Sequence, residues 1–191
     1  LGSDWRILTD LPVTEGRFQD GYYVNGNAQA FVAYRDVDGI KTLALAFRGT
    51  DEPADIIDDI TIIDRHYQSL DGLANAVVIR AADLQVDRLF VTGHSLGGAM
   101  AEQFMRRFPD LDEAQSLTLA SPGLVWAQDA GDDPRAVHIY HKGGLFEIDD
   151  AIAGAFSDGN VLGSLLKIHT PTLIDPFAEH DSSRYRDHVD Q

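Results

Sequence analysis

The stretch that most constrains the fold is residues 89–101, where an expected buried strand runs directly into an expected helix. Residues 89–92 are apolar and β-prone, as a buried strand requires. Beyond the junction, apolar side chains repeat at helical spacing over residues 100–108, until Pro109 ends the pattern. A strand that passes at once into a helix indicates an α/β sheet with this unit near its centre.

A Gly-x-Ser-x-Gly pattern lies at the junction, with Gly93, Ser95 and Gly97 as its fixed residues. A sharp strand-to-helix turn holds a serine hydroxyl clear of the backbone, where a base can take its proton. We expect glycines here because a Cβ would collide with the neighbouring strand or helix, and we expect Ser95 to adopt an unfavourable backbone conformation. The N–H of Leu96 would then point to where a carbonyl oxygen becomes negative. The pattern predicts a nucleophile and half of an oxyanion hole.

The size of the chain favours one domain. With 191 residues, of which 44% are hydrophobic, the chain can bury one substantial core and is short for two domains. We therefore treat residues 1–191 as a single domain. Residues 1–3, Leu-Gly-Ser, resemble a cloning remnant, so this domain could be excised from a longer protein.

The net charge of −16, from 15 basic and 31 acidic residues, disfavours nucleic acid as a partner because phosphates would be repelled. Such acidity is compatible with export, a salty milieu or surface calcium, and composition does not choose among these. No apolar run approaches the roughly 20 residues of a membrane helix. The sequence has no cysteine, which excludes disulfides, a thiol nucleophile and thiolate metal sites.

Strands and helices alternate along the rest of the chain. An initial hairpin followed by this alternation predicts an α/β sheet, mostly parallel, with its ligand site at the carboxyl ends of the strands. We expect hairpin strands at 28–35 and 41–47, a crossover helix at 70–84, and further strands at 114–120 and 136–140.

A second motif lies where the 41–47 strand ends. Phe47-Arg48-Gly49-Thr50 leads into an acidic segment at 55–60. One interpretation is a strand end followed by a solvated helix. The other is that Thr50 supplies the second half of the oxyanion hole, with its N–H and hydroxyl directed toward Ser95.

Together, Phe47-Arg48-Gly49-Thr50 and Gly93-His94-Ser95-Leu96-Gly97-Gly98-Ala99 resemble the class 3 (fungal-type) lipase family. The resemblance implies the α/β-hydrolase fold, with a central, mostly parallel sheet, an antiparallel N-terminal hairpin and helices on both faces. It also implies that Thr50 is the oxyanion hydroxyl residue. In that family a mobile lid often follows this residue, which makes residues 51–57 a lid candidate.

The general base is expected late in the chain, because this fold orders its triad Ser, acid, His. The segment around His180 is similar to the family's late segment, in which the catalytic His is followed five residues later by a Tyr, here Tyr185. His169 and His188 are alternatives. The expected strand at 136–140 brings two further histidines, His138 and His141, which would face opposite sides and which we interpret as ordinary strand residues.

The acid is where the sequence departs from the family pattern. An ungapped comparison places Gly144 at the acid position, and glycine cannot orient an imidazole. A shift of six residues brings in Asp150, followed by Ala-Ile-Ala, which resembles the family's Asp-x-Val/Ile-x. Asp150 is the predicted acid, with Asp149, Asp175 or a missing acid as alternatives.

The resemblance implies a serine carboxylic-ester hydrolase, a lipase or esterase, with the triad Ser95, His180 and Asp150 and an acyl-enzyme. An A1-type phospholipase domain of a larger secreted protein and a catalytically silent binding module are the alternatives. The expected partner is an acyl-ester or lipid substrate, with transient contact at a lipid interface, lipid degradation as the role and an extracellular location. No cofactor or metal is expected, and the oligomeric state stays open.

Overall fold

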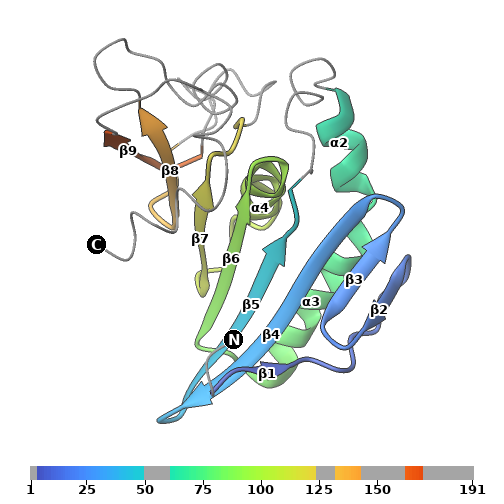
Figure 1. Ribbon diagram of the computed structural model, residues 1–191. Helices are drawn as coiled ribbons and strands as arrows, with labels where there is room; N and C mark the ends of the chain where they lie inside the picture. The colour runs from blue at the N-terminus through green and yellow to red at the C-terminus, as the bar shows by residue number, and fades with distance from the viewer. Residues whose placement is uncertain (1–3, 50–60, 124–131, 143–161, 170–191) are drawn as a thin grey trace.

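The computed structural model describes residues 4–49, 61–123, 132–142 and 162–169. These residues form one sheet of nine strands with helices packed against it (Figure 1). The strands are β1 (Arg6–Ile7), β2 (Arg17–Gln19), β3 (Tyr22–Asn25), β4 (Ala28–Val37), β5 (Ile40–Phe47), β6 (Arg88–His94), β7 (Ala114–Leu119), β8 (Ala136–Lys142) and β9 (Ser164–His169). The helices are α2 (Thr61–Gln68), α3 (Asp71–Leu84) and α4 (Leu96–Arg107).

The strand order is β2-β3-β4-β5-β6-β7-β8-β9, with β1 paired to β4 outside this path. Pairing is antiparallel from β2 to β5 and parallel from β5 to β9. The predicted α/β sheet with an antiparallel N-terminal hairpin is confirmed. The hairpin turns at Asp38 and Gly39, both with positive φ, which is the backbone that a two-residue Asp-Gly turn favours.

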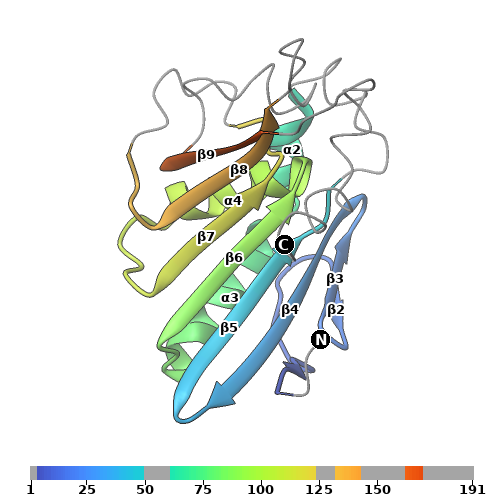
Figure 2. The same cartoon turned by 60° about the vertical axis from the view of Figure 1, so that its left-hand side comes forward.

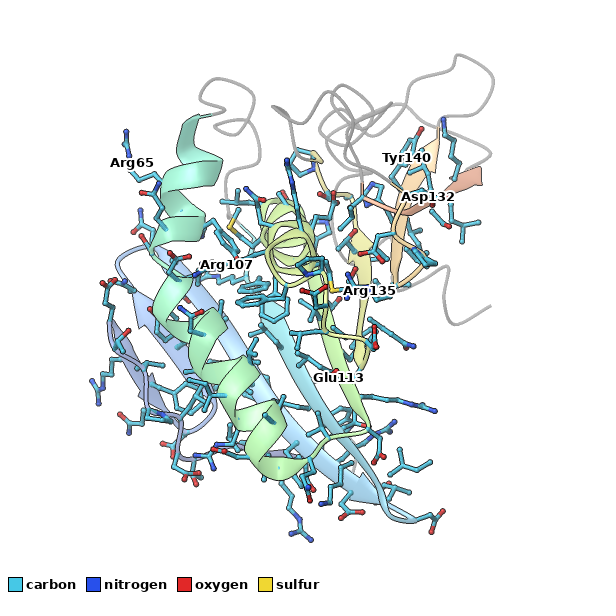
Figure 3. The ribbon with its side chains drawn as sticks, turned by 180° about the vertical axis from the view of Figure 1, so that it is seen from behind. Arg65, Arg107, Glu113, Asp132, Arg135 and Tyr140 are labelled. Atoms are coloured by element: carbon cyan, nitrogen blue, oxygen red, sulfur yellow. The ribbon has the colours of Figure 1, made fainter. Side chains whose placement is uncertain are left out.

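The three described helices cover one face of the sheet (Figure 3). Helix α4 packs against β5, β6 and β7, and α3 packs against β5. Arg107 on α4 forms an ion pair with Asp71 at the start of α3, which ties the two helices together. The expected second layer, on the other face, is not found among the described residues, and Figure 2 shows that face with α3 and α4 behind the strands.

The core lies between the sheet and this helix layer. On α3, the predicted stripe residues Leu73, Val77 and Ala81 are buried. On α4, a stripe that includes Met100 and Phe104 is buried against the strands. The helical spacing in the sequence therefore identified the faces that pack on the sheet.

Some elements were not predicted: the β2–β3 hairpin, helix α2 and strand β9. The strands β2 and β3 have only three and four residues, which is too short for an alternating pattern to stand out.

Candidate active site

Ser95 occupies the turn between β6 and α4, at the carboxyl end of a parallel strand where the ligand site was predicted. Its backbone has φ 56° and ψ −129°, a strained conformation for a residue with a Cβ. Hydrogen bonds hold it there: the Ser95 N–H donates to the carbonyl of Leu119 at 2.9 Å, and the Ser95 carbonyl accepts the N–H of Gly98 at 2.8 Å. The predicted unfavourable conformation is confirmed.

The glycines allow α4 to approach the strands closely. A Cβ at Gly93 would lie 2.2 Å from the carbonyl carbon of Gly97, and one at Gly97 would lie 2.3 Å from the carbonyl oxygen of Phe47. A Cβ at Gly49 would lie 2.6 Å from the carbonyl oxygen of His94. The predicted collisions are thus present, and the end of the Phe-Arg-Gly motif lies directly against the turn that carries the serine.

The hydroxyl of Ser95 is fully buried, and among the described residues its Oγ has no hydrogen-bond partner. An unsatisfied buried hydroxyl costs roughly 1–3 kcal/mol; Ser116 has one too, and what distinguishes Ser95 is its strained turn at a helix start. Leu96 is the first residue of α4, and its N–H belongs to the first turn, where no acceptor exists within the helix. The predicted nucleophile and one predicted oxyanion donor are therefore adjacent at the start of α4.

The other predicted site residues, Thr50, Asp150 and His180, lie outside the described residues, and so does the lid candidate at 51–57. The same holds for the alternatives Asp149, Asp175 and His188, while for His169 the backbone alone is described, in β9. The triad as a unit therefore stays a prediction.

A second buried polar group lies between α4 and strands β7 and β8. His138, which is fully buried, has its Nδ1 2.8 Å from the hydroxyl of Thr118 and 3.9 Å from Oε1 of Glu102. The other carboxylate oxygen of Glu102 accepts the N–H of Leu162 at 3.2 Å. Burial raises the pKa of Glu102 to about 7, against the opposing effect of hydrogen bonds from Ser121, Leu162 and Thr118. We call Glu102, Thr118, Ser121 and His138 the buried cluster.

The buried cluster is not a triad with Ser95, although Ser95, Glu102 and His138 follow the chain order of one. Glu102 is two turns along the same helix, about 10 Å from Ser95 along the axis. The Nδ1 of His138 is engaged by Thr118, and the Ser95 hydroxyl bonds to none of the cluster. The sequence pattern predicts an ordinary strand residue at His138, and it gives Glu102 no role.

A signal for Glu102 was present in the sequence. It lies three residues after Ala99 and three before Met105, and both of these are buried on α4. A carboxylate within an apolar helical stripe must be buried with partners, because an isolated buried charge is too costly.

No group of three or more His, Asp or Glu side chains in the described ranges could hold a metal ion. None of the helices α2, α3 and α4 is long and apolar enough to cross a membrane.

No protein-family model matches the chain, and no curated protein matches its sequence. Solved structures do resemble it. The Lip2 lipase of Yarrowia lipolytica has a TM-score of 0.61 and 16% identity, over 93% of this chain and 70% of that one. A triacylglycerol lipase from Penicillium expansum has a TM-score of 0.56 and 18% identity, over 86% and 72%.

The triacylglyceride lipase of Rhizomucor miehei has a TM-score of 0.50 and 18% identity, over 73% of this chain and 59% of that one. Against three structures of the Rhizomucor enzyme the chain spans only 49–59% of their length. The resemblance to fungal lipases is confirmed at the level of the fold.

Proposed function

We propose that this chain is a serine carboxylic-ester hydrolase of the lipase or esterase type. The observation that carries the proposal is Ser95, held at positive φ between β6 and α4 with a buried hydroxyl that no described residue engages. Such a turn presents a serine to a base and, at once, to the first N–H groups of a helix. The likeness to structures named as triacylglycerol lipases supports the same reaction class.

In the proposed reaction, the Oγ of Ser95 attacks the ester carbonyl carbon while His180 takes the hydroxyl proton. The tetrahedral intermediate collapses, the carbon–oxygen bond to the alcohol breaks, and His180 gives its proton to the leaving oxygen. Water then attacks the acyl-enzyme in the same way and releases the carboxylic acid. Asp150 is the proposed acid that orients the imidazole and stabilises its cation.

The N–H of Leu96 and the hydroxyl and N–H of Thr50 are the proposed oxyanion donors. The close approach of Gly49 to the turn supports this role for Thr50, which is the next residue along the chain. Removal of one such donor costs on the order of 10²–10³ in turnover.

The test is covalent labelling with a fluorophosphonate, which reacts only with an activated serine. The wild-type chain should be labelled and should hydrolyse nitrophenyl esters, whereas Ser95→Ala should do neither. Ser116→Ala is the matched control, because Ser116 is also buried with an unengaged hydroxyl but lies within β7. Labelling that survives Ser95→Ala would overturn the proposal, and a wild-type chain that takes no label would indicate a silent binding module.

The substrate class and setting are part of the same proposal. We propose neutral acyl esters or lipids met at an interface, in an extracellular setting that the acidity of the chain suits, with residues 1–191 as one domain. Hydrolysis of phospholipid vesicles with release of the sn-1 acid, in the absence of triacylglycerol hydrolysis, would favour the A1-type phospholipase instead.

A further inference from the structure

A cavity of about 280 Å³ opens on the face of the sheet opposite the helices, because its lining residues Thr42 and Phe90 alternate along their strands with the core residues Leu43 and Leu89. It lies near the first residue of β6, whereas Ser95 follows the last residue of that strand. At about 3.3 Å per residue the two are roughly 23 Å apart, so this cavity is separate from the proposed active site. The residues that line it are Trp5, Arg35, Thr42, Arg88, Leu89, Phe90 and Gln115.

The register of the sheet brings two arginines to either side of one threonine. Arg35 on β4 pairs with Thr42 on β5, which in turn pairs with Arg88 on β6. Residues paired across neighbouring strands project from the same face, so all three side chains reach the cavity. The Cα atoms of the two arginines are about two strand spacings apart, roughly 10 Å. Their side chains are long enough for both guanidinium groups to contact one small group between them.

The hydroxyl of Thr42 is buried without a partner. Thr42 is only 4% exposed, and its Oγ1 forms no hydrogen bond with any described residue. Valine would fill the same space without the cost of a desolvated hydroxyl. Thr42 lines the cavity, although its Oγ1 is itself closed to solvent, so a ligand there would engage this hydroxyl once the side chain rotates toward the opening.

The arginines leave their N–H groups available. The guanidinium carbon of Arg35 lies 4.9 Å from the centroid of the Trp5 ring, a cation–π contact that holds the guanidinium at the cavity. Among the described residues, neither Arg35 nor Arg88 forms a hydrogen bond or an ion pair with another side chain. None of the lining residues is acidic. In a chain of net charge −16, two such cations beside a buried hydroxyl form a site for an anion.

The rest of the lining is apolar. The ring of Trp5 and the ring of Phe90, which is 36% exposed, stand beside the arginines. A bare inorganic anion would leave these rings in water. A ligand with an apolar body would cover them.

We propose that this cavity binds an amphiphilic carboxylate, with its head between Arg35, Thr42 and Arg88 and its apolar body against Trp5 and Phe90. The guanidinium groups donate to the carboxylate oxygens, and the Thr42 hydroxyl donates to one of them. The proposal does not depend on the proposed ester hydrolysis, because none of these residues belongs to that site.

The test follows the fluorescence of Trp5. The chain has two tryptophans, so Trp126→Phe leaves Trp5 as the only reporter, and Ser95→Ala removes turnover. This double variant is titrated with octanoate below its micellar concentration. Two comparison ligands are octan-1-ol, which has the apolar chain without the charge, and inorganic phosphate, which is an anion without an apolar chain. Octanoate should give a saturable change. Octanol should bind at least about tenfold more weakly because it lacks the charged head, and phosphate at least about tenfold more weakly because it has no apolar part to cover the rings.

Substitutions in the site should separate binding from folding. Arg88→Gln should weaken octanoate binding about tenfold or more, and Thr42→Val should weaken it several-fold while it raises the melting temperature of the free protein. Arg17→Gln is the matched control, since Arg17 is an exposed arginine on β2, away from the cavity, and should leave binding unchanged. Calorimetric titration provides a readout that does not depend on the Trp5 ring.

Three results would overturn the proposal. One is the absence of saturable octanoate binding to a chain that is folded by circular dichroism. Another is an affinity for octanol or phosphate equal to that for octanoate. Equal binding of octanol would show that the charge is not recognised, and equal binding of phosphate would show that the apolar part is not. The third is octanoate binding that survives both Arg88→Gln and Thr42→Val, which would place the ligand elsewhere.

Discussion

Helix α4 carries buried polar groups of two opposite kinds. At its start, Ser95 has a strained backbone and a hydroxyl that no described residue engages. Two turns later, Glu102 is buried in unstrained helix beside the other residues of the buried cluster, and one of its carboxylate oxygens accepts the N–H of Leu162. Backbone strain is a cost that folding alone would remove, whereas the hydrogen bonds of Glu102 Oε2 and of Thr118 with His138 contribute to the packing of the helix on β7 and β8, even though Oε1 of Glu102 has no hydrogen-bond partner among the described residues. The contrast lies in the backbone: Ser95, the proposed nucleophile, is strained, whereas Glu102 lies in regular helix.

The largest effect should come from the serine. Ser95→Ala should lower kcat/KM for nitrophenyl esters by about 10⁴-fold or more, because the nucleophile is removed. The melting temperature should stay the same or rise, since the variant loses an unengaged hydroxyl. Steady-state kinetics and thermal unfolding of the same sample measure both. A large loss of stability would show that the hydroxyl is structural, and the contrast with Glu102 would then fail.

A smaller but still large effect is expected at the glycine that lets α4 approach β5. Gly97→Ala should destabilise the fold by about 3 kcal/mol or more, because the new Cβ would meet backbone atoms of Phe47 that cannot move away alone. Urea unfolding measures the change. The control is Gly26→Ala, where the added Cβ meets nothing within 4 Å and positive φ alone costs about 1 kcal/mol. Equal effects at the two positions would contradict the close approach.

The next effect depends on pH. Burial raises the pKa of Glu102 from 4.5 to about 7, so between these values the folded protein binds a proton that the unfolded chain has lost. The stabilisation from this proton is complete below pH 4.5 and is lost as pH rises through 7, a difference of about 3 kcal/mol. Glu102→Gln should remove this slope from the pH dependence of the unfolding free energy.

The comparison for that prediction is urea unfolding at pH 5 and pH 8 for wild type, Glu102→Gln and Glu15→Gln. Glu15 is exposed, so its variant should follow wild type. If the Glu102→Gln chain keeps the full wild-type slope, the carboxyl is not the group that titrates in this range.

The smallest effect is expected from the hydrogen bond between Thr118 and His138. Thr118→Val keeps the shape of the side chain but removes the hydroxyl 2.8 Å from Nδ1, and it should cost about 1–2 kcal/mol of stability. Fluorophosphonate labelling of Ser95 should keep its wild-type rate, which a structural role for the buried cluster requires. A labelling rate that is lower in the Thr118→Val chain than in wild type would instead connect the cluster to catalysis.

The elements that the sequence predicted share long, regular patterns. The hairpin of β4 and β5, helix α3, and the β6–α4 unit each carry enough residues for the period of the apolar side chains to show. The β2–β3 hairpin is too short for that, and β9 pairs at the far edge of the sheet, where neighbours rather than local pattern decide its existence. Of the candidate site, Ser95 and Leu96 could be placed because their geometry is set by adjacent residues.

What the sequence alone determined about this protein is local: the apolar periods, the turn at Ser95 and the need for glycine at Gly93 and Gly97. The apolar periods and the contact of Gly93 with Gly97 follow from sterics within a few residues of each other, whereas the backbone of Phe47 at Gly97 and the hydrogen bond of Ser95 to Leu119 come from neighbouring strands. Only the tertiary structure decided which distant polar groups meet. Glu102 meets Thr118 and His138, and Arg35, Thr42 and Arg88 stand in one row, because strand order and register choose neighbours that lie far apart along the chain.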